Sequence, residues 1–381
     1  MKLSLTTIMK HTLALLTALL LAPLALRAET PPQTIRETLV WTTGESGAEA
    51  PNIPGVCQSR YGTLLAFCEG RIRPGDADPH HLLLKRSTDQ GATWSESLFV
   101  ERSEHGECYG NPTPVVDRNS GRVLLFYARN AGSERTQLFL RTSDDDGLTW
   151  TDRVDLTQLF DADPLKRPFH LPGPGHGTQL RSGRLVIPVW HRFPLWEKPG
   201  EKLPVPERGY AISLVSSDDG GKTWRNGGFT RQELVLNESR VVELANGDLL
   251  LSARSTDLGK SRVKPLLMRS SDMGATWRKE DGGDVFPKAT PCDASLLRLT
   301  HGIAADQDRL LFSWPNHPAK RMNMTVALSR DDGRTWPVRR KIHDGAGYSD
   351  LVELDNGSIG LLYQRGRKIW FARFNLGWLE Q

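Results

Sequence analysis

The chain has 381 residues, a formal net charge of +4 and 38% hydrophobic residues. Its Lys and Arg residues are spread along the sequence without a basic block, which argues against a nucleic-acid partner. The length and the hydrophobic fraction are sufficient for one large domain with a substantial core.

The N-terminal segment has the pattern of a secretory signal peptide. Lys2 and Lys10 precede an apolar run over residues 12–26, and Ala28 is a small residue at a plausible cleavage site. The run is short for a membrane span. We therefore expect residues 1–28 to be a signal peptide and residues 29–381 to be a secreted or periplasmic domain, with no membrane attachment after signal removal. An uncleaved anchor is the alternative.

The eight-residue phrase Ser-x-Asp-x-Gly-x-Thr-Trp occurs five times. Its copies start at Ser87, Ser143, Ser217, Ser270 and Ser329. In each copy we expect the Asp to cap the backbone of a turn, the Gly to adopt a positive φ, and the Trp to fold back under the loop. The Asp residues of successive copies lie 53 to 74 residues apart, which predicts a repeat architecture. These Asp boxes should stabilise turns on the outside of the repeats and should not touch a ligand.

Short β-type segments separate the Asp boxes. Five of them start with a turn Gly and continue as a nearly unbroken apolar run, which is typical of an inner strand buried on both faces. These segments are residues 62–67, 121–127, 183–189, 247–252 and 357–363. Five boxes and a last unit without a box predict an all-β fold, a six-bladed β-propeller in a single domain. Pairing of residues 38–41 with residues 368–374 would close the circle and remove an open sheet edge.

The cysteines and histidines give no sign of a metal site. The four cysteines are Cys57, Cys68, Cys108 and Cys292. Their even number suits an oxidising compartment, but they lack C-x-x-C spacing, and their pairing stays open. His80 and His176 show no metal-ligand spacing and are expected to be scaffold or loop residues. No cofactor and no metal are expected.

Five segments place charged side chains beside apolar strands. They are residues 69–76, 237–239, 252–254, 321–323 and 347–350. Arg71, Arg254 and Arg321 would form an anion site if they converged on the central channel, because guanidinium groups match carboxylates in shape and charge. Glu238 near Tyr348 would supply a base for a phenol whose ordinary pKa of about 10 keeps it protonated.

At these segments the chain closely resembles the sialidase (neuraminidase) superfamily, over essentially the whole predicted mature chain. Residues 65–71 followed by Asp76 resemble the family's acid/base segment. Asn237-Glu238-Ser239 resembles the segment with the Glu that activates the nucleophile, and residues 347–351 (Gly-Tyr-Ser-Asp-Leu) resemble the nucleophile segment.

Further segments carry the same resemblance. Arg254 and Arg321 match two members of the family's carboxylate-binding arginine triad. Residues 111–114, which begin with Asn111, and residues 173–177 match motifs that line the family's pocket. Several independent motifs in the family's order make the resemblance specific.

The resemblance implies a retaining glycoside hydrolase that releases terminal sialic acid, or a related 2-keto-3-deoxy sugar acid, from sialylated or other acidic glycans. Tyr348 would be the nucleophile, Glu238 its base, and Asp76 the acid/base catalyst. Asp78 could be the acid instead of Asp76. Tyr348 could be a packing residue, Glu238 a partner of an arginine, and the arginines could form salt bridges between blades.

Two positions depart from the family's pattern. The family's first triad arginine lies in Arg-Ile-Pro, and this chain has Asn52-Ile53-Pro54 there. Near the C-terminus the family has Tyr-Glu, whose Glu supports that arginine, and this chain has Tyr363-Gln364. The changes fit together, because a carboxylate without its cation would be an unpaired buried charge. We therefore expect Asn52 and Gln364 to line a site that holds the substrate carboxylate differently, with Arg365 or Arg367 as candidate helpers.

Two other functions stay open. One is a glycosidase for a different acidic sugar, and the other is a non-catalytic propeller that binds glycans or proteins. The retained Asp76, Glu238 and Tyr348 argue against a pure binder, which does not need a buried phenol–carboxylate pair.

Overall fold

The computed structural model describes residues 34–130, 134–194, 196–198, 201–202, 208–231, 234–255, 265–280, 286, 291–300 and 309–381. The predicted signal peptide lies outside these residues, so the structure does not test it. No helix among the described residues is long and apolar enough to cross a membrane.

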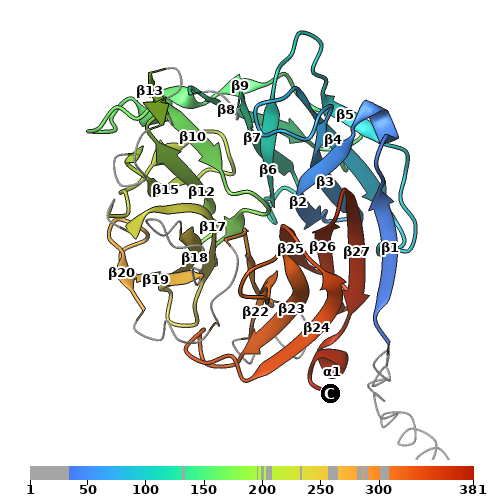
Figure 1. Ribbon diagram of the computed structural model, residues 1–381. Helices are drawn as coiled ribbons and strands as arrows, with labels where there is room; N and C mark the ends of the chain where they lie inside the picture. Colours follow the sequence, from blue (N-terminus) through green and yellow to red (C-terminus); the bar gives the residue numbers. More distant parts are fainter. Residues whose placement is uncertain are drawn as a thin grey trace, which may run out of the picture. The chain divides into compact units, whose positions relative to one another are not determined.

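The described strands form six antiparallel blades around a central axis (Figure 1). Blades 1 and 2 are β2 Ala50–Gln58, β3 Leu64–Arg71, β4 His80–Ser87 and β5 Leu98–Glu101, then β6 Tyr109–Val116, β7 Val123–Arg129, β8 Gln137–Ser143 and β9 Val154–Asp155. Blade 3 is β10 Phe169–Pro172, β11 Thr178–Gln179, β12 Leu185–Arg192, β15 Ala211–Ser217 and β16 Arg225–Asn226, and blade 4 is β17 Leu236–Glu243, β18 Leu249–Ser255, β19 Leu266–Ser270 and β20 Arg278–Lys279.

Blades 5 and 6 complete the circle. They are β21 Ser295–Arg298, β22 Leu310–Pro315, β23 Met322–Ser329 and β24 Val338–Gly345, then β25 Ser349–Glu353, β26 Ile359–Arg365, β27 Lys368–Phe374 and β1 Arg36–Trp41. Outside the blades are the hairpin β13 Trp196–Lys198 and β14 Glu201–Lys202, the 3-10 helices η1 Glu45–Gly47 and η2 Thr157–Phe160, and the short helix α1 Leu376–Leu379. The predicted six-bladed β-propeller is confirmed.

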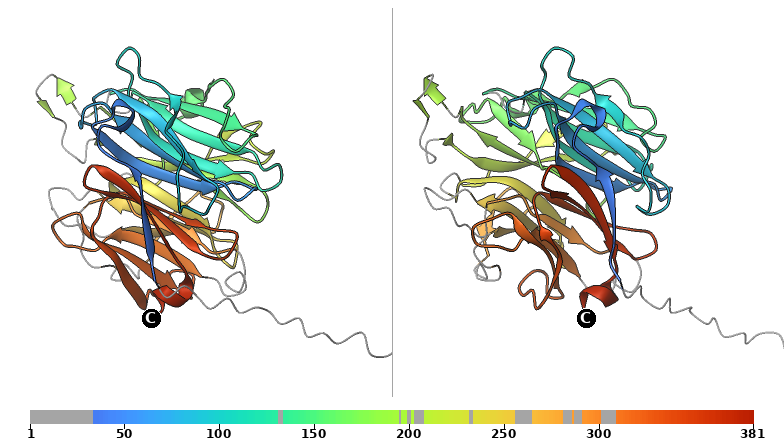
Figure 2. Two further views of the ribbon diagram at one scale, coloured as in Figure 1. Left: turned by 90° about the vertical axis from the view of Figure 1, so that its right-hand side faces the viewer. Right: turned by 45° about the vertical axis from the view of Figure 1, so that its right-hand side comes forward.

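The circle is closed by the first and the last strands of the chain. β1 pairs with β27 in a register that runs from Arg36↔Arg373 to Trp41↔Ile369, as the sequence predicted. The two strands lie side by side in Figure 2. This pairing covers an edge that would otherwise be free to pair with another chain.

The Asp boxes have the predicted turn geometry. Each box begins at the last residue of the third strand of its blade. In all five, an Asp side-chain oxygen accepts a hydrogen bond from the backbone N–H of the box Thr at 2.8–2.9 Å, and the box Gly has a φ between +78° and +87°. The turn is thus satisfied by its own side chain, as expected for Asp in loops.

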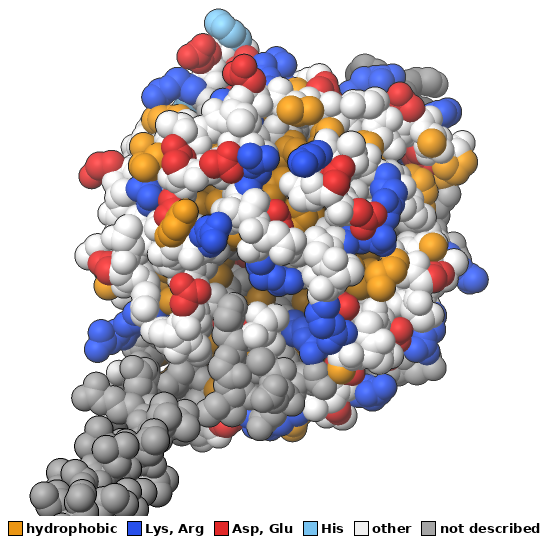
Figure 3. Space-filling model, turned by 180° about the vertical axis from the view of Figure 1, so that it is seen from behind, with side chains coloured by type: hydrophobic (Ala, Val, Ile, Leu, Met, Phe, Trp, Pro, Cys, Tyr) orange, Lys and Arg blue, Asp and Glu red, His pale blue; other side chains and the backbone are white. Residues whose placement is uncertain are grey.

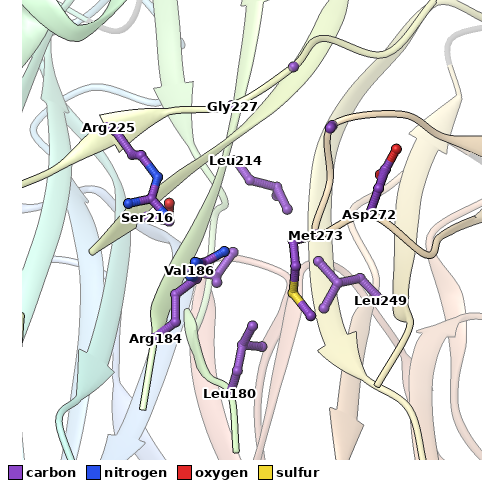
Figure 4. Close-up of a pocket in the computed structure, with 12 residues that line it drawn as sticks. Leu180, Arg184, Val186, Leu214, Ser216, Arg225, Gly227, Leu249, Asp272 and Met273 are labelled. Atoms are coloured by element: carbon purple, nitrogen blue, oxygen red, sulfur yellow. The ribbon is translucent and has the colours of Figure 1, made fainter. Parts of the chain in front are cut away.

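The boxes also pack against the neighbouring blade. Figure 4 shows the fourth box, where Asp272 and Met273 lie near Leu214 of blade 3 and Leu249 of blade 4. A Cβ on Gly274 would lie 2.6 Å from the Leu214 side chain, so this approach requires glycine. The cavity here, of about 200 Å³, belongs to a junction between blades.

The apolar segments that begin with Gly are the second strands of their blades, not the innermost ones. β3, for example, is buried at every residue, as a strand covered on both faces should be. The strands that precede these segments line the central channel: β2, β6, β17 and β25, together with β10, β11 and β21. Their sequences are more polar, because their inner faces meet the channel. All four cysteines are buried, and Cys57, Cys68 and Cys292 are free thiols.

We predict that Trp41 is essential to closure, and that its neighbour Leu39 is not. Trp41 is 1% exposed and its indole N–H donates to Ser97, whereas Leu39 on the same strand is 41% exposed. Trp41→Ala should lower the free energy of unfolding by about 3–5 kcal/mol. Leu39→Ala should change it by less than about 1 kcal/mol. Urea unfolding of both variants measures the difference, and equal losses would contradict this account of closure.

Candidate active site

Every site residue predicted from the sequence lies at the same end of its blade. In an antiparallel blade, the start of the first strand, the end of the second and the start of the third meet at one edge. The first strands carry four of these residues at or just before their start: Asn52, Asn111, Glu238 and Tyr348. The second strands carry three at their end: Arg71, Arg254 and Gln364. Asp76 lies in the loop after β3, and Arg321 lies just before the third strand β23. The topology therefore places all nine at one end of the channel.

A phenol and a carboxylate meet across this end. The Tyr348 hydroxyl donates to Glu238 Oε1 at 2.5 Å, although Glu238 belongs to blade 4 and Tyr348 immediately precedes β25 of blade 6. Tyr348 is 6% exposed and contacts Ile53 and Cys292. Its backbone carbonyl accepts a hydrogen bond from Gln364 N at 2.9 Å, which fixes the segment against β26.

The surroundings keep this phenol protonated until a base removes the proton. Burial, followed by the negative charge of Glu238, raises the pKa of Tyr348 well above its ordinary value, against the opposing effect of Arg254 and Arg321. Glu238 is already hydrogen-bonded to the proton that it would accept. The pair thus has the geometry of a nucleophile with its general base.

Arg254 contacts both members of this pair. Its Nη1 donates to Glu238 Oε2 at 2.6 Å and to the Tyr348 hydroxyl oxygen at 2.9 Å. When the proton moves from Tyr348 to Glu238, negative charge moves from one oxygen to another that the same guanidinium contacts. Arg254 Nε is buried and has no hydrogen-bond partner among the described residues, so this N–H donor is available to a ligand.

Arg321 reaches the pair from blade 5. Its guanidinium lies 5.1 Å from the centre of the Tyr348 ring, within cation–π range, and Nη2 lies 3.4 Å from the Pro291 carbonyl oxygen. The structure thus brings Arg254 and Arg321 together at Tyr348.

Asp76 lies in an exposed loop and is paired with Arg71. The Arg71 Nη1–Asp76 Oδ1 distance is 2.5 Å, and the Asp76 side chain is 90% exposed. Arg71 also binds the buried Glu69, at 2.7 and 2.8 Å. Asp78 instead binds Arg73 and the backbone N–H of Gly75, so it caps its own loop. The geometry favours Asp76 over Asp78 as the residue available to a ligand.

Asn52 and Gln364 each carry an unsatisfied acceptor. Asn52 faces Glu69 in the β2–β3 register, and its Oδ1 is buried with no hydrogen-bond partner in the part of the chain that the structure describes. Within the same residues Gln364 Oε1 is likewise buried without a partner, while its Nε2 donates to Gly366 O at 3.2 Å. Buried polar atoms without partners are uncommon, and both of these lie at the end where a ligand would bind.

Arg365 has partners away from Gln364. Its guanidinium stacks on Trp370 at 3.7 Å and lies 3.9 Å from Glu37. Its side chain also packs at the position a Cβ on Gly345 would occupy. A role in carboxylate binding would require Arg365 to leave this stack.

Asn111 has a structural role in the described contacts. Its Nδ2 donates to the Pro172 carbonyl of blade 3 at 2.9 Å, and its backbone N–H donates to Glu69 at 3.0 Å. Its positive φ of 56° is one that Asn tolerates better than most residues. Its contact with substrate stays a prediction.

The sequence analysis missed a second layer of charge below the phenol–carboxylate pair. Arg240, Asp293 and Asp350 are each at most 1% exposed, and Arg240 contacts both carboxyl groups. The available signal was spacing, because Arg240 and Asp350 lie two residues after Glu238 and Tyr348. His80 and His176 are hydrogen-bonded within the protein, as expected, to Gly75 and Asp350 respectively.

The other end of the first strands opens into a cavity of about 710 Å³. Arg118, Arg181 and Arg298 line it and donate to backbone carbonyls, so they tie blades together. Figure 3, which shows the molecule from behind, has positive and negative side chains interspersed over this face. Among the described residues, no group of three or more His, Cys, Asp or Glu could hold a metal ion.

Comparisons with known proteins place the chain in a family. The BNR repeat-like domain matches residues 62–361. A sialidase of Micromonospora viridifaciens is 31% identical over 358 residues, which cover 88% of this chain and 53% of the relative. A sialidase of Bacteroides fragilis is 30% identical over 354 residues, covering 84% and 61%. The chain thus spans little more than half the length of these two relatives, whereas it covers 85% of Sialidase-3 of Rattus norvegicus at 30% identity.

Solved structures show the same fold. The Hadza microbial sialidase Hz136 has a TM-score of 0.78 and 25% identity, with 90% of this chain and 68% of that chain covered. Trypanosoma rangeli sialidase has a TM-score of 0.71 at 19% identity, with 91% and 60% covered, which supports the fold alone. On the domain match and on relatives of this identity and coverage, the chain belongs to the sialidase family of BNR-repeat propellers.

Proposed function

We propose that this protein is a retaining, exo-α-sialidase-like glycoside hydrolase with Tyr348 as its nucleophile. The observation that carries the proposal is the 2.5 Å hydrogen bond from the buried Tyr348 hydroxyl to Glu238, with Arg254 in contact with both. Covalent catalysis needs a nucleophile, a base that accepts its proton and a third group that orients the base, and these three residues have the geometry for those roles.

The reaction would proceed in two displacements at the anomeric carbon. In the first, the Tyr348 oxygen bonds to that carbon and its proton passes to Glu238, while the bond to the leaving oxygen breaks and Asp76 protonates that oxygen. In the second, water attacks the same carbon, Asp76 takes a proton from the water, and Tyr348 leaves and regains its proton from Glu238. Two inversions give net retention.

A tyrosine suits a sugar acid because the anomeric carbon of a sialoside carries a carboxylate. An attacking Asp or Glu anion would be repelled by that negative charge. Tyr348 begins neutral and loses its proton only as it attacks. Arg254 and Arg321 would bind the substrate carboxylate and orient the ring.

Asn52 and Gln364 would set the choice of sugar acid. A neutral amide at residue 52 in place of an arginine removes a charge-assisted fork worth about 1.5–3 kcal/mol. That corresponds to roughly 10- to 150-fold in affinity, which shifts substrate preference without abolishing the chemistry. The protein would then act on terminal sialic acid or on a related 2-keto-3-deoxy sugar acid, in sialylated or other acidic glycans.

A second candidate function is a glycosidase for a different acidic sugar. The unsatisfied oxygens of Asn52 and Gln364 favour it, because they can accept a hydrogen bond from a substrate hydroxyl or amide. In either case we propose that residues 1–28 direct the protein to a secreted or periplasmic location.

We predict that Tyr348→Phe abolishes turnover of a fluorogenic α-sialoside by residues 29–381. Loss of the nucleophile should lower kcat by at least about 1,000-fold. Tyr363→Phe is the matched control, because Tyr363 is also a buried tyrosine hydrogen-bonded to a glutamate, Glu37. Near-normal kcat in Tyr348→Phe, or equal losses in the two variants, would refute the nucleophile assignment.

We predict that Asp76→Asn affects substrates according to their leaving group. The loss of kcat/KM should be about 100- to 10,000-fold for a sugar leaving group, which needs protonation, and much smaller for an acidic phenol leaving group. Asp78→Asn is the control, and it should lose little with either substrate. If Asp78→Asn shows the dependence on leaving group instead, the acid assignment moves to Asp78.

We predict that Asn52→Arg combined with Gln364→Glu raises kcat/KM for ordinary sialosides by about 10-fold or more, because it restores one charge-assisted fork with its supporting carboxylate. Asn52→Arg alone should gain less, because its cation would lack a buried partner. Comparison of kcat/KM for the wild type, the single and the double variant measures the effect. No gain in the double variant would show that the two positions do not set carboxylate recognition.

A further inference from the structure

The separation of Glu238 from Tyr348 is not set by pairing within a sheet. Glu238 lies on β17 of blade 4, Tyr348 precedes β25 of blade 6, and blade 5 stands between them. Their 2.5 Å hydrogen bond therefore depends on what joins these blades inside the channel.

A second contact, between Arg240 and Asp350, joins strand β17 to strand β25. Arg240 and Asp350 lie two residues after Glu238 and Tyr348 in the sequence. Arg240 Nε lies 3.4 Å from Asp350 Oδ1. From blade 5, Asp293 completes the link with contacts of 2.8 and 3.3 Å to the guanidinium of Arg240.

Asp350 collects hydrogen bonds from blades all around the channel. Its Oδ2 accepts from Val56 N of blade 1 at 2.9 Å and from His176 N of blade 3 at 3.0 Å. Its Oδ1 accepts from His176 Nδ1 at 2.8 Å and from Ser295 Oγ of blade 5 at 3.1 Å. With Arg240 of blade 4, one carboxylate of blade 6 thus contacts four other blades.

This carboxylate is 0% exposed. Burial alone would raise the pKa of Asp350, but the positive charges of His176 and Arg240 and the Val56 amide outweigh it and lower the pKa. The guanidinium that faces Asp350 also needs space. A Cβ on Gly175 would lie 1.9 Å from Arg240 Nη2, so only glycine leaves room for this guanidinium.

We propose that Asp350 is a positioning residue for the reaction, which fixes Tyr348 at hydrogen-bonding distance from Glu238 by holding β25 against blades 1, 3, 4 and 5. The inference rests on the proposed function for its kinetic consequence. Its structural consequence, the Tyr348–Glu238 distance, can be measured without any substrate.

The test variant is Asp350→Asn, which keeps the shape of the side chain. The amide oxygen can still accept from Val56 N and His176 N, but the amide nitrogen cannot accept from Arg240 Nε, and the charge is lost. A displacement of about 1 Å at a reacting group can cost about 100-fold in rate. We expect kcat per folded molecule to fall by about 100-fold while KM changes by less than about 3-fold, because Asp350 is 0% exposed and offers no surface to a sugar.

The control is Asp355→Asn, in the exposed turn that follows β25, which should keep the kcat and KM of the wild type. Crystal structures of the wild type and Asp350→Asn supply the second readout. The Tyr348 hydroxyl and Glu238 Oε1 should move beyond about 3.5 Å in the variant, with the blades otherwise superimposable. Wild-type kcat together with an unchanged distance would overturn the proposal.

Two further variants keep the question decidable if Asp350→Asn does not fold. Ser295→Ala and His176→Gln each remove or weaken one donor and leave the charge of Asp350 in place. Each should lower kcat by about 3- to 10-fold with KM unchanged, and wild-type kcat in both would overturn the proposal. If the wild type releases no sugar acid, the proposed function fails, and the crystallographic distance alone then decides the positioning role.

Discussion

A buried charge must be surrounded by partners, and this constraint shapes the centre of the propeller. The repeated architecture of the six blades does not by itself place Glu238 of blade 4 next to Tyr348 of blade 6. Side chains that cross the channel hold these two blades together. Arg240 and Asp293 form one buried ion pair, and Asp350 accepts hydrogen bonds from four other blades. Because a single unpaired charge here would cost several kcal/mol, the innermost strands are tied to one arrangement. Glu238 and Tyr348, the pair that we propose to be catalytic, lie two residues before Arg240 and Asp350 in the sequence.

The proton chemistry at the site follows from the same low exposure. A phenol at the surface would titrate near its ordinary pKa, whereas burial and Glu238 keep Tyr348 protonated. Arg254 contacts the Tyr348 hydroxyl oxygen and Glu238 Oε2, so the guanidinium lies beside both members of the pair. Asp76 contrasts with this pair, because its side chain is 90% exposed in a loop, where it binds Arg71.

The sequence predicted the fold well because its signals were local and repeated. Each Asp box specifies its own turn, and each Gly-led apolar run specifies a strand buried on both faces, so five copies identified a propeller and its closure by β1 and β27. The order of strands within a blade was less accessible, since the most apolar strand is the second and the channel-lining strand is more polar. The contacts of Asp350 could not be predicted, because they join residues that lie 55 to 294 positions apart and depend on closure of the circle. Asn52 and Gln364 were visible only as departures from a family pattern, and the structure adds that both carry buried acceptors without partners.

The measurement that tests the central claim most directly is the location of the covalent intermediate. The wild-type protein is incubated with a 2,3-difluorinated sialic acid donor, which slows hydrolysis of a glycosyl-enzyme, and the labelled peptide is identified by mass spectrometry. The account predicts one added sugar acid per molecule on the peptide that contains Tyr348, with fragment ions that assign it to the phenol oxygen. An adduct on any other residue, or steady turnover of a sialoside with net inversion and no adduct, would contradict it.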